Sequence, residues 1–205
     1  MKNLVRVLVV ITFFFSTLLA FAGSDNTFTN VTVGFNVTKP DSWQFFTAEQ
    51  NLENLKRMQL NDEQFRKVML KYSTAPLVAM MKYPEPYDDL NPSLKVNVKP
   101  LGNLKGTDPK GIINLVAAPL KSVFEDFEIT VPPTDITVSG LRAGYTQFNY
   151  SVTSPDGRSF PTTSELWIVP RGDYFFIIGA GTRQDEKTGT RAEIQNILKT
   201  VKIDN

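Results

Sequence analysis

Hydrophobic and polar positions alternate along several short stretches of this chain, and a period of two is typical of half-buried β-strands. The stretches 31–37 and 93–98 alternate in this way, and a continuous apolar run occupies 77–81. Two further extended segments flank Pro132-Pro133. Because proline cannot donate a hydrogen bond to a β-ladder, we expect a break or a sheet edge at that pair.

The spacing of apolar positions changes to that of a helix in three places. A helix is expected near 62–72, where apolar side chains recur at i, i+3, i+4 and i+7. The stretch 110–124 has a broad apolar face that Pro119 should kink or interrupt. A capping-box pattern opens a third helix at 190–200, followed by a short terminal strand.

Three strands joined by tight turns are expected in the C-terminal half. In chain order, these strands and turns are 141–152, the turn 154–157, 160–169, the turn 170–173 and 174–179. In the segments 166–169 and 174–178 both the odd and the even positions are apolar. In a sheet with one solvent-exposed face, apolar and polar positions would alternate along each strand. Both faces therefore need cover. The predicted fold class is α+β, a three-layer α-β-α sandwich with a central, mostly antiparallel sheet.

The side chains expected in the core of this sandwich lie on the strand and helix faces that need cover. They are Tyr145, Phe148, Trp167, Phe175, Ile177, Ile194 and Leu198, and Trp43 is also interpreted as a core residue.

The first 22 residues have the layout of a cleaved secretory signal. Lys2 and Arg6 precede an apolar stretch that ends in the cleavage-like triplet 20–22. An uncleaved anchor needs about 20 apolar residues, and the uncharged run here is shorter. The predicted organisation is a signal peptide (1–22), a disordered lead-in (23–30) and a single domain (31–205). We expect a periplasmic or secreted protein with no stable membrane anchor after cleavage.

Charge and composition exclude several classes of function. The chain has 22 basic and 21 acidic residues, and removal of the signal takes away two basic ones, so the mature net charge is near −1. This balance gives no electrostatic case for binding nucleic acid. The chain has no cysteine and no histidine. Ser-His-Asp and Cys-His catalysis and histidine-ligated zinc are therefore excluded.

What remains for an enzyme is chemistry based on carboxylates, lysine or tyrosine. Glu125, Asp126 and Glu128 are the obvious carboxylates, but the first two are adjacent and would not face each other on a helix. We therefore assign no catalytic residue, and we expect no cofactor and no metal. An enzyme is not excluded, but a protein without catalytic activity is the favoured interpretation.

An acidic, proline-rich loop is the candidate site for binding a partner protein. Its candidate residues are Tyr83, Glu85, Tyr87, Asp88, Asp89 and Asn91. Loops on a rigid scaffold often carry function, and tyrosines are frequent anchors in interfaces. The spacing of the carboxylates does not match a calcium loop. The alternative is a solvated connector whose tyrosines cover the core.

Several short motifs, in this order, resemble those of the PsbP-like superfamily. They are the turn Pro40-Asp41-Ser42-Trp43, the segment 81–84 before 91–96, Gly140 to Tyr145 at the start of a hairpin, and a terminal helix closing on 197–203. The superfamily includes extrinsic photosystem subunits, a Ran-binding import factor and the DcrB-like bacterial lipoproteins. The chain resembles the small exported bacterial members of the superfamily. It lacks the lipidation cysteine of the DcrB-like group. The resemblance implies a fold, and a role in binding proteins rather than in catalysis.

Two functional hypotheses follow. The first is an exported, non-catalytic accessory protein that binds another envelope or secreted protein. The alternative is a small-molecule-binding protein, or a carboxylate-based enzyme, with a cleft at one end of the sheet. A cleft above about 300 Å³ with convergent polar groups would favour the alternative. A flat, partly apolar exposed patch would favour the first hypothesis.

Overall fold

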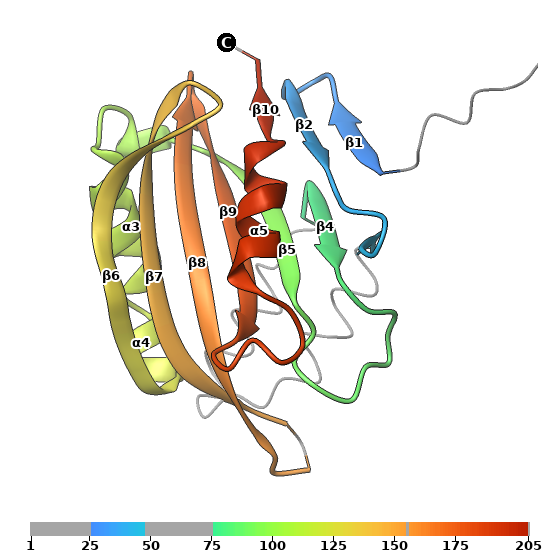
Figure 1. The fold of residues 1–205 in the computed structure, drawn as a ribbon. Coiled ribbons are helices and arrows are strands. Elements are labelled where there is room, and N and C mark those ends of the chain that lie inside the picture. Colours follow the sequence, from blue (N-terminus) through green and yellow to red (C-terminus); the bar gives the residue numbers. More distant parts are fainter. Residues whose placement is uncertain (1–25, 48–75, 155, 205) are drawn as a thin grey trace, which may run out of the picture.

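The structure, a computed structural model, describes residues 26–47, 76–154 and 156–204. Its largest element is a seven-stranded sheet in which all neighbouring strands pair antiparallel (Figure 1). In spatial order the strands are β3 (Gln44–Phe45), β4 (Val78–Met81), β5 (Ser93–Pro100), β9 (Tyr174–Arg183), β8 (Ser159–Arg171), β7 (Leu141–Thr153) and β6 (Glu125–Val138). The antiparallel sheet expected from the sequence is therefore confirmed.

A second, three-stranded sheet stands beside the first (Figure 1). It consists of β1 (Thr27–Asn30), β2 (Phe35–Thr38) and β10 (Lys202–Ile203), with β2 in the middle. The terminal strand expected after the last helix is thus present, and it pairs antiparallel with β2.

The predicted disorder of 23–30 is wrong for residues 27–30, which form β1. Phe28 pairs with Val37 of β2 and packs against the core, which stabilises this segment. The strand expected at 31–37 begins only at Phe35. The reason is a tight turn: the Asn30 side chain accepts hydrogen bonds from two backbone amides after it, and Gly34 has a φ of +58°.

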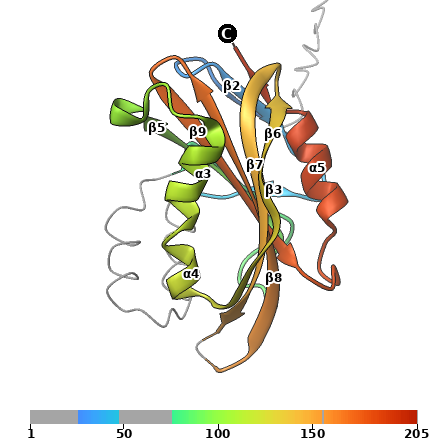
Figure 2. The same cartoon turned by 90° about the vertical axis from the view of Figure 1, so that its left-hand side faces the viewer.

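Two helical segments follow the 3₁₀ turn η1 (Gly102–Leu104) and cover one face of the large sheet (Figure 2). The helix α3 (Pro109–Ala117) starts with proline at its first position, and the Asp108 side chain caps it by accepting from an amide at 2.9 Å. It ends just before Pro119, and α4 (Leu120–Val123) follows, as the proline predicts. Gly144 of β7 allows close packing, because a Cβ there would lie 2.8 Å from the Ile113 side chain.

The opposite face of the sheet is covered by α5 (Arg191–Lys199) (Figure 2). The predicted capping box is present: the Thr190 hydroxyl accepts from the Glu193 amide, and the Glu193 carboxylate accepts from the Thr190 amide. Ile194 and Ile197 of this helix pack on Trp167 in one core cluster. Ile112 and Ile113 of α3 belong to a second cluster on the other face. The both-sided burial expected for β8 and β9 is therefore confirmed.

The fold belongs to the α+β class. The helix expected near 62–72 lies outside the described residues, as does the predicted signal peptide, so the complete helical layers of the predicted sandwich are not established. Among the described residues, no helix is long and apolar enough to span a membrane. Of the side chains predicted to be buried, Tyr145, Ile177 and Leu198 are only half-buried.

The edge strand β6 contains the proline pair, as predicted for a break or an edge. Its pairing with β7 shifts register at three places, and two of these shifts lie on either side of Val131, just before the prolines. These bulges leave its outer edge irregular, which is a common protection of a sheet against pairing with another chain.

Candidate functional site

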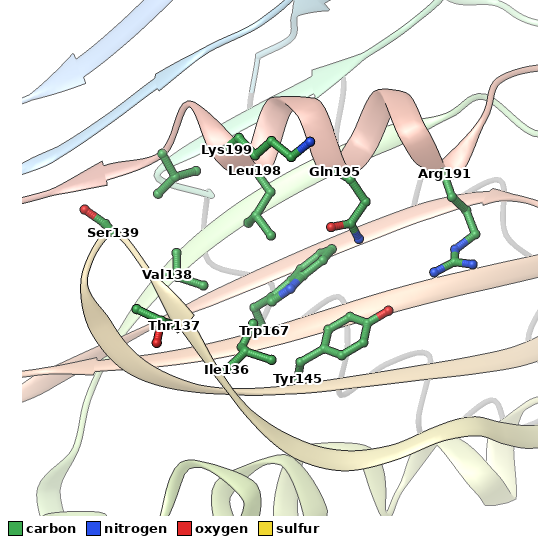
Figure 3. A pocket seen from close by; sticks show the side chains of 11 residues that line it. Ile136, Thr137, Val138, Ser139, Tyr145, Trp167, Arg191, Gln195, Leu198 and Lys199 are labelled. Atoms are coloured by element: carbon green, nitrogen blue, oxygen red, sulfur yellow. The ribbon is translucent and has the colours of Figure 1, made fainter.

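A cleft of about 550 Å³ lies between α5 and the hairpin formed by β6 and β7 (Figure 3). Side chains from α5 form one wall, the β6–β7 turn forms the opposite wall, and the indole of Trp167 lies between them. The half-burial of Tyr145 and Leu198 is explained by this cleft, because both side chains line it. Its volume is within the range of ligand pockets in proteins.

The end of the cleft beside the β6–β7 turn carries most of its apolar lining, together with the polar side chains of Thr137, Ser139 and Lys199 (Figure 3). Ile136 and Val138 of β6 face Leu198 of α5, with Trp167 beside them, and Val201 also lines the cleft. Trp167 is 1% exposed, so it is a core residue with one edge at the cleft. This end suits the apolar part of a ligand.

The other end of the cleft is polar and is organised by a buried carboxylate, Glu165. Its side chain is 3% exposed and lies directly behind the lining residues. One carboxylate oxygen, Oε1, accepts hydrogen bonds from the Tyr145 hydroxyl at 2.7 Å, the Gln195 amide at 2.6 Å and the Arg191 guanidinium at 3.2 Å. The three donors are thereby fixed in position around the mouth of the polar end.

The fold places these groups through the register of the sheet and the pitch of the helix. Glu165 on β8 pairs with Gln147 on β7, and Tyr145 is two residues from Gln147 on the same face. Arg191 and Gln195 are four residues apart on α5, so they lie on one face of the helix above the sheet. Gln147 is buried and donates to the Thr130 hydroxyl at 2.9 Å, which extends the polar network to β6.

The electrostatics keep Tyr145 as a neutral donor. Burial, the hydrogen bond to Glu165 and the charge of that carboxylate together raise the pKa of Tyr145 well above its ordinary value. Arg191 is 40% exposed, and its buried Nε has no hydrogen-bond partner. A buried donor without a partner is costly, and a ligand that accepts from it would remove that cost.

The chemistry available is recognition of a small molecule by a polar group at one end and an apolar body at the other. Among the residues that the structure describes, no group of three or more acidic side chains is placed to hold a metal ion. Glu165 uses one oxygen to fix three donors, which is the role of an organising acceptor.

The six candidate residues of the acidic loop lie close together at one end of the sheet. The rings of Tyr83 and Tyr87 stack with centroids 4.4 Å apart. Asn91 accepts from the Tyr83 amide at 3.0 Å, and its own amide donates to the Tyr83 carbonyl at 2.8 Å and to Glu85 at 2.9 Å. The loop is therefore closed on itself by the side chain of Asn91.

The two aspartates of the loop are paired with arginines that are distant in sequence. Asp88 accepts from Arg158, at the start of the β8 hairpin, at 2.8 Å. Asp89 accepts from Arg183 of β9 at 2.7 Å. The Asp88 side chain is nevertheless 93% exposed, so it protrudes from the surface. A second cleft, of about 370 Å³, lies between this loop and the β7–β8 hairpin.

The loop and α5 are also connected. Lys82, just before the loop, contacts the Glu193 carboxylate of the capping box at 2.8 Å. The Thr188 hydroxyl, just before α5, donates to the Leu90 carbonyl at 2.8 Å. These contacts fix the polar end of the first cleft to the loop.

Sequence patterns did not point to Glu165, Arg191 or Gln195. One signal was available: Glu165 interrupts an otherwise apolar and hydroxyl-bearing strand, at the parity of Trp167, where a charge needs a buried partner. Identifying that partner required the packing of α5 on the sheet.

No model of a known protein family matches the chain, and no curated protein matches it in sequence. Solved structures that are similar to it include LpqN, a protein involved in cell envelope biogenesis of Mycobacterium tuberculosis. LpqN is 16% identical, with 83% of each chain covered and a TM-score of 0.50.

Two further similar structures are more distant. The cyanobacterial PsbP of Synechocystis sp. PCC 6803 is 10% identical over 87% of this chain and 91% of its own, with a TM-score of 0.47. PA94 of Pseudomonas aeruginosa, a protein of unknown function, is 13% identical over 85% of this chain and 93% of its own, with a TM-score of 0.42. The fold is of the LpqN type, and a PsbP-like protein is among its structural neighbours, as the sequence resemblance predicted. At these identities the likeness extends to the fold alone.

Proposed function

We propose that the chain is an exported, non-catalytic binding protein that holds a small organic molecule in the cleft under α5. The observation that carries this proposal is the arrangement of Tyr145, Arg191 and Gln195 around buried Glu165 at one end of a 550 Å³ cleft whose other end carries most of its apolar lining. Pre-positioned polar groups beside an apolar wall are the usual design of a ligand pocket.

The exposed apolar surface favours this proposal over a protein-binding face. Within the described ranges, three large hydrophobic side chains are strongly exposed: Val31, Leu115 and Ile129. They lie on three different elements, the β1–β2 turn, α3 and β6. Singly scattered hydrophobic side chains are normal on a protein surface.

Export is part of the proposal. The signal-like segment 1–22 supports it, and LpqN, which shares the fold, is involved in cell envelope biogenesis. N-terminal sequencing of the exported form is expected to begin at Gly23 or within a residue or two. Recovery of the full-length chain in the membrane would contradict export with cleavage. A complete three-layer sandwich, with further helical cover from 62–72, also remains a proposal.

Native mass spectrometry of the mature protein, purified from its own host under mild conditions, tests the ligand. We expect a small molecule to be retained and to be released on unfolding. In Leu198→Trp the larger side chain fills the apolar end, so the ligand should be lost while the fold persists. Leu115→Trp, on an exposed position of α3, is the matched control and should retain the ligand. Retention by both variants, or by neither variant nor the parent, would contradict the proposal.

A second candidate function is binding of another protein through the loop 83–91. The observation that favours it is the protruding Asp88 beside the stacked tyrosines, on a loop that Asn91 closes. A loop that is already ordered loses less entropy on binding. The alternative is that the same contacts have a structural role only and cover the end of the hydrophobic core.

The double variant Tyr87→Ala with Asp88→Ala separates these two possibilities. A binding loop should lose capture of a verified partner with the melting temperature unchanged, whereas a structural seal should melt earlier. Asp156→Ala is the control, because Asp156 pairs with the same Arg158 from outside the loop. Survival of capture in the folded double variant would end the loop hypothesis.

A further inference from the structure

The second cleft contains a lysine with an unusual environment, Lys95 of β5. It pairs in register with Ala79 on β4 and with Gly179 on β9, two residues with little or no side chain. Its neighbours Leu94 and Val96 point into the core under α5, so Lys95 points to the opposite face of the sheet. A Cβ built on Gly179 would meet no atom within 4 Å, so there is open space beside the lysine.

The ammonium of Lys95 has no carboxylate partner among the described residues. Its one close charged or aromatic neighbour there is the Phe46 ring, with the centroid 5.7 Å from Nζ. Burial lowers the pKa of Lys95 to about 8. A partly buried cation without a counter-ion is a favourable position for an anionic ligand.

The walls of this cleft supply both hydroxyl donors and apolar surface. Ser93 and Tyr87 line it, and burial raises the pKa of Tyr87, so its hydroxyl stays protonated at neutral pH. Met81, Leu90 and Phe160 provide the apolar part of the lining. The volume of about 370 Å³ is sufficient for a small organic molecule.

The acidic groups that border the cleft restrict the charge of its ligand. Asp88 and Asp89 pair with Arg158 and Arg183, which also contact Asp156 and Asp185, and Glu85 accepts from the Asn91 amide. Of the cations that the structure describes at this cleft, Lys95 is therefore the one without a carboxylate partner. A dianion would bring a second charge close to these carboxylates, whereas a monoanion would not.

We propose that the cleft between the loop 83–91 and the β7–β8 hairpin binds a small organic monocarboxylate. The Lys95 ammonium pairs with the carboxylate, the Tyr87 and Ser93 hydroxyls donate to it, and the apolar part lies against Phe160 and Leu90. This site is separate from the cleft under α5, and it does not depend on the function proposed there.

The pairing makes binding dependent on pH. The carboxylate needs the protonated amine, so affinity is highest below pH 8 and falls about tenfold for each pH unit above it. Between pH 7 and pH 9.5 the loss should be about 30-fold. The other charged groups beside the cleft are Asp88, Asp89, Glu85, Arg158 and Arg183. Hydrogen bonds to aspartates raise the pKa of both arginines, and burial raises the pKa of Tyr87, so Lys95 dominates the profile.

Benzoate is a suitable probe, with benzamide as its neutral counterpart of equal shape. The lysines of the mature protein are labelled by ¹³C reductive methylation, which keeps their charge, and the Lys95 signal is identified by its absence in Lys95→Met. Benzoate should shift this signal and raise its titration midpoint by about one pH unit or more. Benzamide should do neither.

Two variants complete the test. Lys95→Met should bind benzoate at least tenfold more weakly, and Lys99→Met, on the same face of the same strand, should bind as the parent does. The proposal is overturned if benzoate leaves the Lys95 signal unmoved at 50 mM, if benzamide binds equally well, or if Lys95→Met retains the affinity of the parent. Melting curves of both variants establish that each is folded.

Discussion

The substitution Glu165→Gln tests the polar end of the cleft under α5 without changing its shape. In the parent protein the Tyr145 hydroxyl and the Gln195 amide donate to Oε1 of Glu165 at 2.7 and 2.6 Å. The amide oxygen of a glutamine can still accept both hydrogen bonds. What is lost is the negative charge. The experiment therefore isolates the contribution of a buried carboxylate from that of packing.

The size of the effect follows from the hydrogen bonds. A bond to a charged group contributes about 1.5–3 kcal/mol and a neutral one about 0.5–1.5, so the two short bonds lose about 2 kcal/mol together. The pair with Arg191 adds less than about 1 kcal/mol, because that side chain is 40% exposed and solvent screens it. We expect the free energy of unfolding to fall by about 2–3 kcal/mol. For a chain of this size the melting temperature should fall by roughly 4–12 °C.

Urea unfolding followed by circular dichroism at pH 7 gives this quantity. Glu128→Gln, the same change at an exposed position of β6, is the control and should alter stability by less than about 0.5 kcal/mol. Tyr145→Phe should cost about 1–2 kcal/mol, and the double variant should cost less than the sum, because the two groups share one bond. A loss below about 0.5 kcal/mol for Glu165→Gln would mean that the carboxylate does not organise this end of the cleft.

Three other expectations concern the core and the charged groups. Trp167→Ala should cost about 3–5 kcal/mol in urea unfolding, because the indole is 1% exposed, and a loss below about 1 kcal/mol would place it outside the core. Lys95→Met should stabilise the protein at pH 7 by about 1–3 kcal/mol, because the folded-state pKa of about 8 lies below the unfolded value of 10.5. This gain should disappear by pH 10.5, and a constant gain would refute it. Burial raises the pKa of Glu193, but hydrogen bonds from Lys82 and the Thr190 amide outweigh it and lower the pKa overall. Its stabilisation should be present above pH 4.5 and lost as pH falls through the lower folded value, and thermal melts of Glu193→Gln should lack this acid-side dependence.

Local signals in the sequence were sufficient for most of the fold. The strands around Trp167 are apolar at odd and even positions, so both faces of the sheet needed to be covered there. In the structure α3 covers one face and α5 covers the other. Pro119 and the capping box of Thr190 with Glu193 set helix boundaries through backbone chemistry that depends on neighbouring residues alone. Such signals do not require knowledge of distant contacts.

The misjudged segment was β1, whose polar sequence shows no apolar pattern. Its order comes from pairing with β2 and from the burial of Phe28, both of which depend on where the chain returns. The partial exposure of Tyr145 and Leu198 was missed for a related reason. Both lie on faces that need cover, but α5 and the β6–β7 turn leave a cleft between them.

The candidate sites show the same division. The loop 83–91 was visible as a run of prolines, tyrosines and carboxylates, but its arginine partners lie 70 and 94 residues further along the chain. Glu165 and Lys95 are single charges in strands, and their significance depends on which side chains lie opposite. Only the three-dimensional structure shows that the first has three donors and the second no carboxylate partner among the described residues.

The most direct test of the proposed small-molecule cleft is a fragment titration followed by ¹H–¹⁵N spectra of the protein without residues 1–22. The indole N–H of Trp167 and the side-chain amide of Gln195 report on the cleft, and the indole of Trp43, which does not line it, serves as the internal reference. We predict fragments that shift the first two signals together, leave Trp43 unmoved, and no longer bind in Leu198→Trp. Fragments that bind only elsewhere, or that bind Leu198→Trp as well as the parent, would contradict the assignment of this cleft as a ligand site.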